Sequence, residues 1–259
     1  MPAGRIVDVV LQWRPMSRLV ELSIRILRAM PFSPDTERAL WIRAPALIRR
    51  AFWVRLNPPS PFISRHLAGM AGVEIGASAH NDYGLRAINI DRYAEMDTVY
   101  KDEERALAGR ARPIDMVAPG DDLPLRDNAV DFVFASHVIE HFPDPLRALE
   151  EWRRVARSRV VVVVPHPERT LDAGREVTAV TELLRRHADG FTSEEDKHWS
   201  VWTRQSFLAM CDAAGFIVLD SLDPDDKVGN GFIVIIDAAA ARPRAEQDAG
   251  ASLAQLPSS

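Results

Sequence analysis

The sequence predicts an open, doubly wound α/β sheet that is preceded by a separate helical segment. From residue 72 onward, short apolar runs alternate with helical periodicity, which indicates parallel strands joined by crossover helices. One run, 160–164, consists of five consecutive valines, the pattern of a strand buried on both faces. Residues 57–61, NPPSP, have the composition of a linker and separate the sheet from the helical segment.

Each element after the linker follows from a local pattern. Strands are expected at residues 72–76, 86–91, 113–117, 130–136, 160–164, 216–222 and 231–236. Helices are expected at 97–108, 145–156, 177–187 and 203–215. Asp144 and Thr203 are suited to cap the second and fourth helices, with Pro145 at a first helical position. The last two strands are joined by the short turn 223–226, so we expect the last strand to be antiparallel.

Charge and composition divide the chain into three parts, residues 1–66, 67–237 and 238–259. Residues 1–66 hold eleven arginines and four acids, a net charge of +7, which leaves −12 for the remainder of a chain of net charge −5. This basic helical segment is expected to be a lid, a homodimer surface or a docking element, either on its own acidic body or peripherally on an anionic membrane. The tail from residue 238 is expected to be disordered.

The remaining bulk properties favour a cytoplasmic protein. There is one cysteine, which suits a reducing compartment, and no apolar run approaches the length of about 18 residues that a membrane span requires. The amino terminus also lacks the basic start, apolar middle and small-residue site of a signal peptide.

The stretch 130–145, VDFVFASHVIEHFPDP, predicts the active site. An apolar strand ends in His137, Glu140 and His141, and the carboxyl ends of parallel strands are where such sheets place their sites. His-x-x-Glu-His is also a peptidase motif, but that motif needs a regular helix, and Pro143 disfavours helix at the residue before it. The structural alternative is that His141 only orients the next helix and Glu140 only caps it.

Three other acids stand near the ends of earlier strands. Glu74 and Gly76 lie at the end of the first strand, where a glycine allows close approach of a ligand to the backbone. Asp91 ends the second strand, where a carboxylate typically binds a ribose diol. Asp115 lies in the third strand, where it could reach an adenine amino group or serve only as a turn residue.

These motifs resemble a known family. The segments EIGAS, NID, LPLRDNAVDFVFASHVIEHFPDPLRALEEWRRV and VVVVVPHPERTLD resemble class I S-adenosylmethionine-dependent methyltransferases. More narrowly, His80-Asn81, the HVxEHFxDP block and HWSVWT at 198–203 are similar to a methyltransferase type 11-like bacterial group. One departure is that only fourteen residues separate Gly76 from Asp91, so the first crossover must be short.

The resemblance implies a Rossmann-like, seven-stranded sheet with S-adenosyl-L-methionine over its strand ends. The methionine part would face Glu74, Gly76 and Ser78, the ribose Asp91, and the adenine Asp115 with Met116. Ser136, at the end of the fourth strand, completes the expected cofactor-binding set.

We expect the residues that assist methyl transfer to lie in the stretch 130–145. An alcohol acceptor needs a base or a metal, because it is a poor nucleophile while protonated. We expect His141 or His137 as the base, and His137, Glu140 and His141 as ligands of a divalent metal. A related quinone-pathway group holds such a metal with Glu-x-x-Glu-His at this place. Carboxylate favours magnesium, and the added imidazole shifts the preference toward manganese or zinc.

The acceptor is expected to lie under the loops above the sheet. His166 and His198 lie in these loops, and Trp199 and Trp202 next to charged side chains suit a sugar, although both tryptophans could instead be core residues. The predicted function is therefore O-methylation of a carbohydrate or glycosylated metabolite. The alternative is a non-catalytic binding or scaffold protein on the same fold. Nucleic acid is not expected as a partner, because the body is acidic.

Overall fold

A computed structural model describes residues 60–76, 83–108 and 111–239, which form one seven-stranded sheet. The strands are β1 (Gly72–Ile75), β2 (Ala87–Asp91), β3 (Met116–Val117), β4 (Val130–Ser136), β5 (Ala156–Pro165), β6 (Val218–Leu222) and β7 (Gly231–Asp237). Their order is β3-β2-β1-β4-β5-β7-β6. β7 runs antiparallel to both of its neighbours, β5 and β6, which confirms the predicted doubly wound sheet with an antiparallel last strand.

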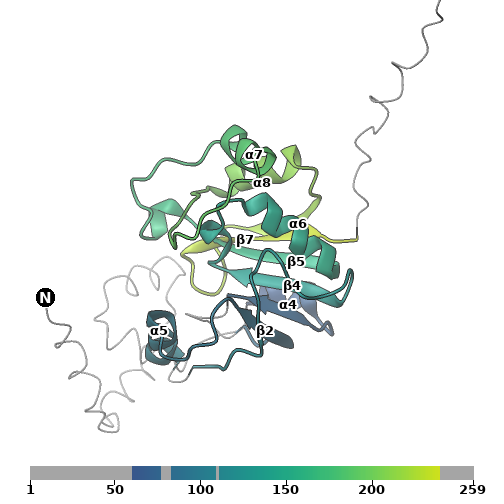
Figure 1. Ribbon diagram of the computed structural model, residues 1–259. Coiled ribbons are helices and arrows are strands. Elements are labelled where there is room, and N and C mark those ends of the chain that lie inside the picture. The colour runs from purple at the N-terminus through teal and green to yellow at the C-terminus, as the bar shows by residue number, and fades with distance from the viewer. Residues whose placement is uncertain (1–59, 77–82, 109–110, 240–259) are drawn as a thin grey trace, which may run out of the picture. The chain divides into compact units, whose positions relative to one another are not determined.

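Helices cover both faces of this sheet (Figure 1). One face packs against α6 (Pro145–Val155), α7 (Val180–Ala188) and α8 (Arg204–Ala213), whose buried side chains share a core with β4 and β5. The other face packs against α4 (Pro61–Leu67). A fifth helix, α5 (Val99–Ala108), follows β2, and two 3₁₀ turns, η2 (Ile139–His141) and η3 (Pro167–Arg169), follow β4 and β5.

The valine run of β5 is buried on both faces, as predicted. Val160, Val162 and Val164 belong to the core under α6 and α8, whereas Val161 and Val163 belong to the core under α4. This alternation follows from the two-residue period of a strand. A central strand of this kind holds the carboxyl edge of the sheet in place.

Two helix caps confirm the sequence analysis and fix the elements that flank the site. The Asp144 carboxylate accepts hydrogen bonds from the backbone amides of Leu146 and Arg147, with Pro145 at the start of α6. The Thr203 hydroxyl accepts a hydrogen bond from the amide of Ser206, whose own hydroxyl accepts one from the amide of Thr203. This capping box fixes the chain direction just after residues 198–202.

Several boundaries differ from the prediction. β5 begins at residue 156 instead of 160, directly after α6, and α7 begins at 180 instead of 177. α4 buries Phe62, Ile63 and Leu67 in the sheet's second core, so the described domain begins before residue 67. The predictions for residues 1–59, for Ser78, His80 and Asn81, and for 240–259 lie outside the described residues. Within the described part of the chain, no helix is both long and apolar enough to cross a membrane.

Candidate active site

The carboxyl end of β4 turns sharply out of the sheet. His137 has a φ of 56°, in the left-handed region, and its amide donates a 2.9 Å hydrogen bond to the carbonyl oxygen of Val163 on β5. One turn of 3₁₀ helix follows, and Phe142 returns to extended backbone before Pro143. The structure therefore has the predicted strand end followed by a broken turn. It lacks the regular helix that the peptidase motif requires.

A distant segment folds back onto this turn. The amide of Trp199 donates a 2.7 Å hydrogen bond to the carbonyl oxygen of Glu140. The carbonyl oxygen of Trp199 in turn accepts one from Arg186 of α7 at 3.1 Å. These contacts bring His198, which precedes Trp199, next to the turn after β4.

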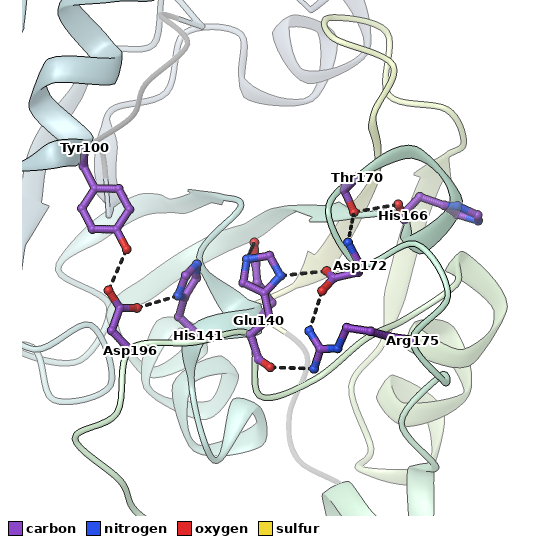
Figure 2. Close-up of polar contacts among 9 residues, drawn as sticks. Tyr100, Glu140, His141, His166, Thr170, Asp172, Arg175 and Asp196 are labelled. Atoms are coloured by element: carbon purple, nitrogen blue, oxygen red, sulfur yellow. Dashed lines mark hydrogen bonds and ion pairs between the residues drawn. The ribbon is translucent and has the colours of Figure 1, made fainter. Parts of the chain in front are cut away.

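Three side chains gather where the two segments meet: Glu140, His141 and His198. Figure 2 labels Glu140 and His141 of this group. Each offers one ligand atom, and these three atoms lie within 4.8 Å of one another. The two imidazole rings are 4.7 Å apart and nearly perpendicular, and Nε2 of His198 lies 4.0 Å from Oε1 of Glu140. The structure thus places His198 in the group where the sequence analysis expected His137.

A carboxylate lies against Nδ1 of each imidazole in the group. Nδ1 of His141 is 2.9 Å from Oδ1 of Asp196, whose other oxygen accepts a 2.6 Å hydrogen bond from the hydroxyl of Tyr100. Nδ1 of His198 is 2.7 Å from Oδ2 of Asp172. Because a carboxylate only accepts hydrogen bonds, each Nδ1 carries the proton and each Nε2 is left with a lone pair.

Burial sets the protonation of the group. It raises the pKa of Glu140 to about 8, and Oε2 of this carboxyl group, which is only 1% exposed, has no hydrogen-bond partner among the described residues. Burial also lowers the pKa of His141, as does the nearby charge of His198, while Asp196 acts in the opposite direction. The site therefore favours a neutral imidazole on His141 and a protonated carboxyl group on Glu140.

His137 lies nearby but on the side of β7. Burial lowers its pKa, against the opposing effect of the nearby Asp225. The charges of His198 and His141 also lower it, which places the three imidazoles within electrostatic reach of one another. His137 is therefore predominantly neutral and able to accept a proton.

The residues expected to bind the cofactor lie only partly as predicted. Glu74 and Asp91 are buried at the carboxyl ends of the adjacent parallel strands β1 and β2. Oδ1 of Asp91 accepts a 3.0 Å hydrogen bond from the amide of Tyr93. Ser136 is half-buried at the end of β4, where its hydroxyl interacts with the phenol of Tyr83.

Asp115 does not lie inside the third strand as predicted. Because β3 comprises only residues 116–117, Asp115 precedes the strand instead of ending it. Its carboxylate accepts a 2.9 Å hydrogen bond from the amide of Asn89 and so ties the amino-terminal side of β3 to β2. Met116 lies in β3, is partly buried and packs against the core.

Both the backbone angle and the close packing at position 76 require a glycine. Its φ is 68°, and a Cβ atom at this position would lie 2.5 Å from Cγ2 of Val138. The turn after β1 therefore packs directly on the turn after β4, and this contact joins the predicted cofactor side of the sheet edge to the three-residue group.

The residues expected at the acceptor differ in their burial. Trp202 is 1% exposed and packs against Phe207, which favours the core alternative over contact with a substrate. Trp199 is half-buried beside the site, with the ammonium group of Lys197 3.9 Å from the centroid of its ring. His166 follows β5 at the same edge, and Figure 2 shows its ring pointing away from the three-residue group.

Sequence reasoning missed Asp196 and Tyr100, and it did not connect Asp172 with His198. The three contacts join residues that are 26, 55 and 96 positions apart in the chain. No local spacing rule connects side chains at such separations. The only available signal was the closeness of Asp196 to His198 in the sequence.

The strand order, with its antiparallel last strand, is that of the Rossmann-like methyltransferase fold. Residues 69–164 match the family model described as a methyltransferase domain. No curated protein matches the chain at a significant level.

Solved structures of similar fold include three proteins of distant sequence. A methyltransferase from Aquifex aeolicus is 17% identical, with a TM-score of 0.42 over 73% of this chain and 98% of that one. A methyltransferase from Thermotoga maritima, described as a possible histamine N-methyltransferase, is 18% identical, with a TM-score of 0.42 over 84% and 98%. The PH0226 protein from Pyrococcus horikoshii is 15% identical, with a TM-score of 0.44 over 82% and 98%.

Proposed function

We propose that the protein is an O-methyltransferase that transfers the methyl group of S-adenosyl-L-methionine to a hydroxyl of a carbohydrate or glycosylated metabolite. The observation that carries the proposal is the gathering of Glu140, His141 and His198 at the carboxyl end of β4. This edge also holds the buried carboxylates of Glu74 and Asp91, which would bind the methionine and ribose parts of the methyl donor. Donor and acceptor would therefore meet beside the turn after β4.

In this proposal His137 removes the proton of the acceptor hydroxyl. Burial lowers the pKa of its imidazole and so keeps the ring neutral and able to accept a proton. As the new O–CH₃ bond forms, the S–CH₃ bond breaks and its electron pair stays on sulfur. The proton remains on His137 until it passes to water, so the step is balanced without another reactant. A positioned base typically contributes about 10²–10⁴-fold to the rate of such a step.

We further propose that Glu140, His141 and His198 hold a divalent cation. The residues fit such an ion, because two imidazoles present Nε2 and the buried Oε2 of Glu140 lacks a partner among the described residues. A bound cation would lower the pKa of an acceptor hydroxyl and fix its position. It would also compensate the charge of a carboxylate that burial otherwise keeps protonated.

The polar rim of the site supports a hydroxyl-rich acceptor. The guanidinium group of Arg175 contacts Asp172 and the carbonyl oxygen of His198, and Trp199 adds one half-buried aromatic ring. Charged groups bind sugar hydroxyls, and an aromatic side chain packs against the apolar face of a pyranose.

The test is a labelled methyl-transfer assay over a panel of sugars, glycosides and phenols, with and without chelator. We expect labelled product from a sugar or glycoside, and a loss of product when chelator is present. Binding of S-adenosylhomocysteine is measured in parallel by calorimetry. Cofactor binding without transfer to any acceptor would favour a non-catalytic binding protein, and absence of both would refute the proposal.

A further inference from the structure

We propose that Asp172 is a positioning residue that turns Nε2 of His198 toward Glu140 and thereby sets the affinity of the site for a divalent cation. The inference deepens the proposed function and rests on the cation proposed there. Asp172 lies in the loop after η3, 26 positions before His198, and its Oδ2 is 2.7 Å from Nδ1 of that imidazole (Figure 2). The carboxylate therefore selects which ring nitrogen is available to a ligand.

The orientation follows from hydrogen-bonding rules. An imidazole that donates from Nδ1 to a carboxylate keeps its lone pair on Nε2, and the hydrogen bond also restricts rotation of the ring. Nε2 of His198 lies 4.0 Å from Oε1 of Glu140, a separation across which two ligands can share one ion. Without Asp172, the ring of His198 could rotate or change tautomer, and Nε2 would then be present at the site for only part of the time.

Arg175 holds Asp172 and His198 together through hydrogen bonds to both. One of its guanidinium nitrogens donates to Oδ1 of Asp172, and another donates a 2.8 Å hydrogen bond to the carbonyl oxygen of His198. The same side chain thus holds both partners of the Asp172–His198 contact. Burial acts to raise the pKa of Asp172, but hydrogen bonds from His198 and Arg175 outweigh it and keep the pKa below its ordinary value.

The second orienting carboxylate is weaker. Asp196 holds Nδ1 of His141 in the same way, but its side chain is 52% exposed, whereas that of Asp172 is 5% exposed. Hydrogen bonds to a charged group are stronger in the less polar interior, and water competes for Asp196. We therefore expect Asp172 to matter more than Asp196 for ion binding.

The donor set indicates the class of ion. Two imidazoles and one carboxylate favour manganese or zinc, whereas magnesium and calcium prefer oxygen ligands alone. The test accordingly uses Mn²⁺ and Zn²⁺ alone, added to the full-length protein after chelator treatment, with Mg²⁺ for comparison.

Isothermal titration calorimetry measures the dissociation constant of each ion. We expect Asp172→Asn to weaken binding by about 10–100-fold, the usual effect of losing an orienting partner of a metal ligand. Asp196→Asn should weaken it less. The matched control is Glu176→Gln, which removes an exposed carboxylate from the same segment and should leave the affinity unchanged. Equal affinity of wild type and Asp172→Asn, or a larger effect at Asp196, overturns the proposal.

A spectroscopic readout separates orientation from a general loss of structure. Electron spin echo modulation of bound Mn²⁺ reports its imidazole ligands, and we expect two in the wild type and one in both Asp172→Asn and His198→Gln. If Asp172→Asn does not fold, Arg175→Met serves instead. It removes the guanidinium group that contacts both Asp172 and His198, keeps the Asp172 carboxylate, and should still weaken ion binding. A wild-type protein that binds neither Mn²⁺ nor Zn²⁺ refutes the inference. The titrations contain no methyl donor, so they test ion binding alone. Ion binding by a protein that transfers no methyl group would therefore refute only the proposed function.

Discussion

Substitution of Gly76 by alanine tests how the two turns at the sheet edge are joined. The φ of 68° costs an L-residue about 1–2 kcal/mol in the left-handed region. A Cβ would lie 2.5 Å from Cγ2 and 3.0 Å from Cγ1 of Val138, which forces one of the two turns to shift. Overpacking of this kind typically costs about 1–3 kcal/mol. The expected loss in the free energy of unfolding is therefore about 2–5 kcal/mol.

Gly174 provides the matched control. Its φ is 85°, but an added Cβ would meet no atom within 4 Å, so Gly174→Ala carries the backbone cost alone, about 1–2 kcal/mol. Urea unfolding followed by circular dichroism measures both variants. A double variant, Gly76→Ala with Val138→Ala, removes the contacting methyl groups and should show a favourable coupling of about 1–3 kcal/mol.

The result that would refute this reasoning is an equal loss of stability at the two glycines. It would mean that the turn after β1 moves freely relative to Val138 and that the sheet edge is not held by this contact. Absence of coupling in the double variant would lead to the same conclusion.

Two further predictions concern groups inside the domain. Because burial raises the pKa of Glu140 to about 8, above its ordinary 4.5, its contribution to stability is present at low pH and is lost as the pH rises through about 8. In chelator, the stability of Glu140→Gln relative to wild type should therefore increase between pH 4.5 and 8, and a constant difference in urea unfolding would contradict the burial of this group. Trp202→Ala should cost about 3–5 kcal/mol as a core deletion. Trp199→Ala should cost only about 0.5–1.5 kcal/mol for its ring contact with Phe191, and the reverse order in thermal unfolding would be inconsistent with the core position of Trp202.

The sheet was predictable because its signals are local. A run of five valines, a capping Asp144 followed by Pro145, and the final turn without a helix each specify an element within a few residues. These elements then leave few ways to order the strands. The failure at Asp115 has a local cause as well, since the apolar run 113–117 predicts five strand residues where only two pair with β2.

The candidate site was predictable only on the β4 side. Glu140 and His141 follow directly from the sequence, because a strand end and Pro143 place them. His198 replaces His137 in the three-residue group because its segment folds back through the hydrogen bond between Trp199 and Glu140. Trp202 was expected at the substrate together with Trp199, yet three residues along an irregular segment suffice to move a side chain from the surface into the core.

The rate of methyl transfer by His137→Ala tests the central claim most directly. The measurement is the single-turnover rate of labelled transfer from S-adenosyl-L-methionine to the best acceptor, compared with wild type and with His66→Ala, a control on α4. The account predicts a loss of about 10²–10⁴-fold in His137→Ala, with unchanged binding of S-adenosylhomocysteine and a wild-type rate in the control. A wild-type rate in His137→Ala would contradict the proposed role of this imidazole, and absence of transfer by the wild-type protein to any acceptor would contradict the methyltransferase activity itself.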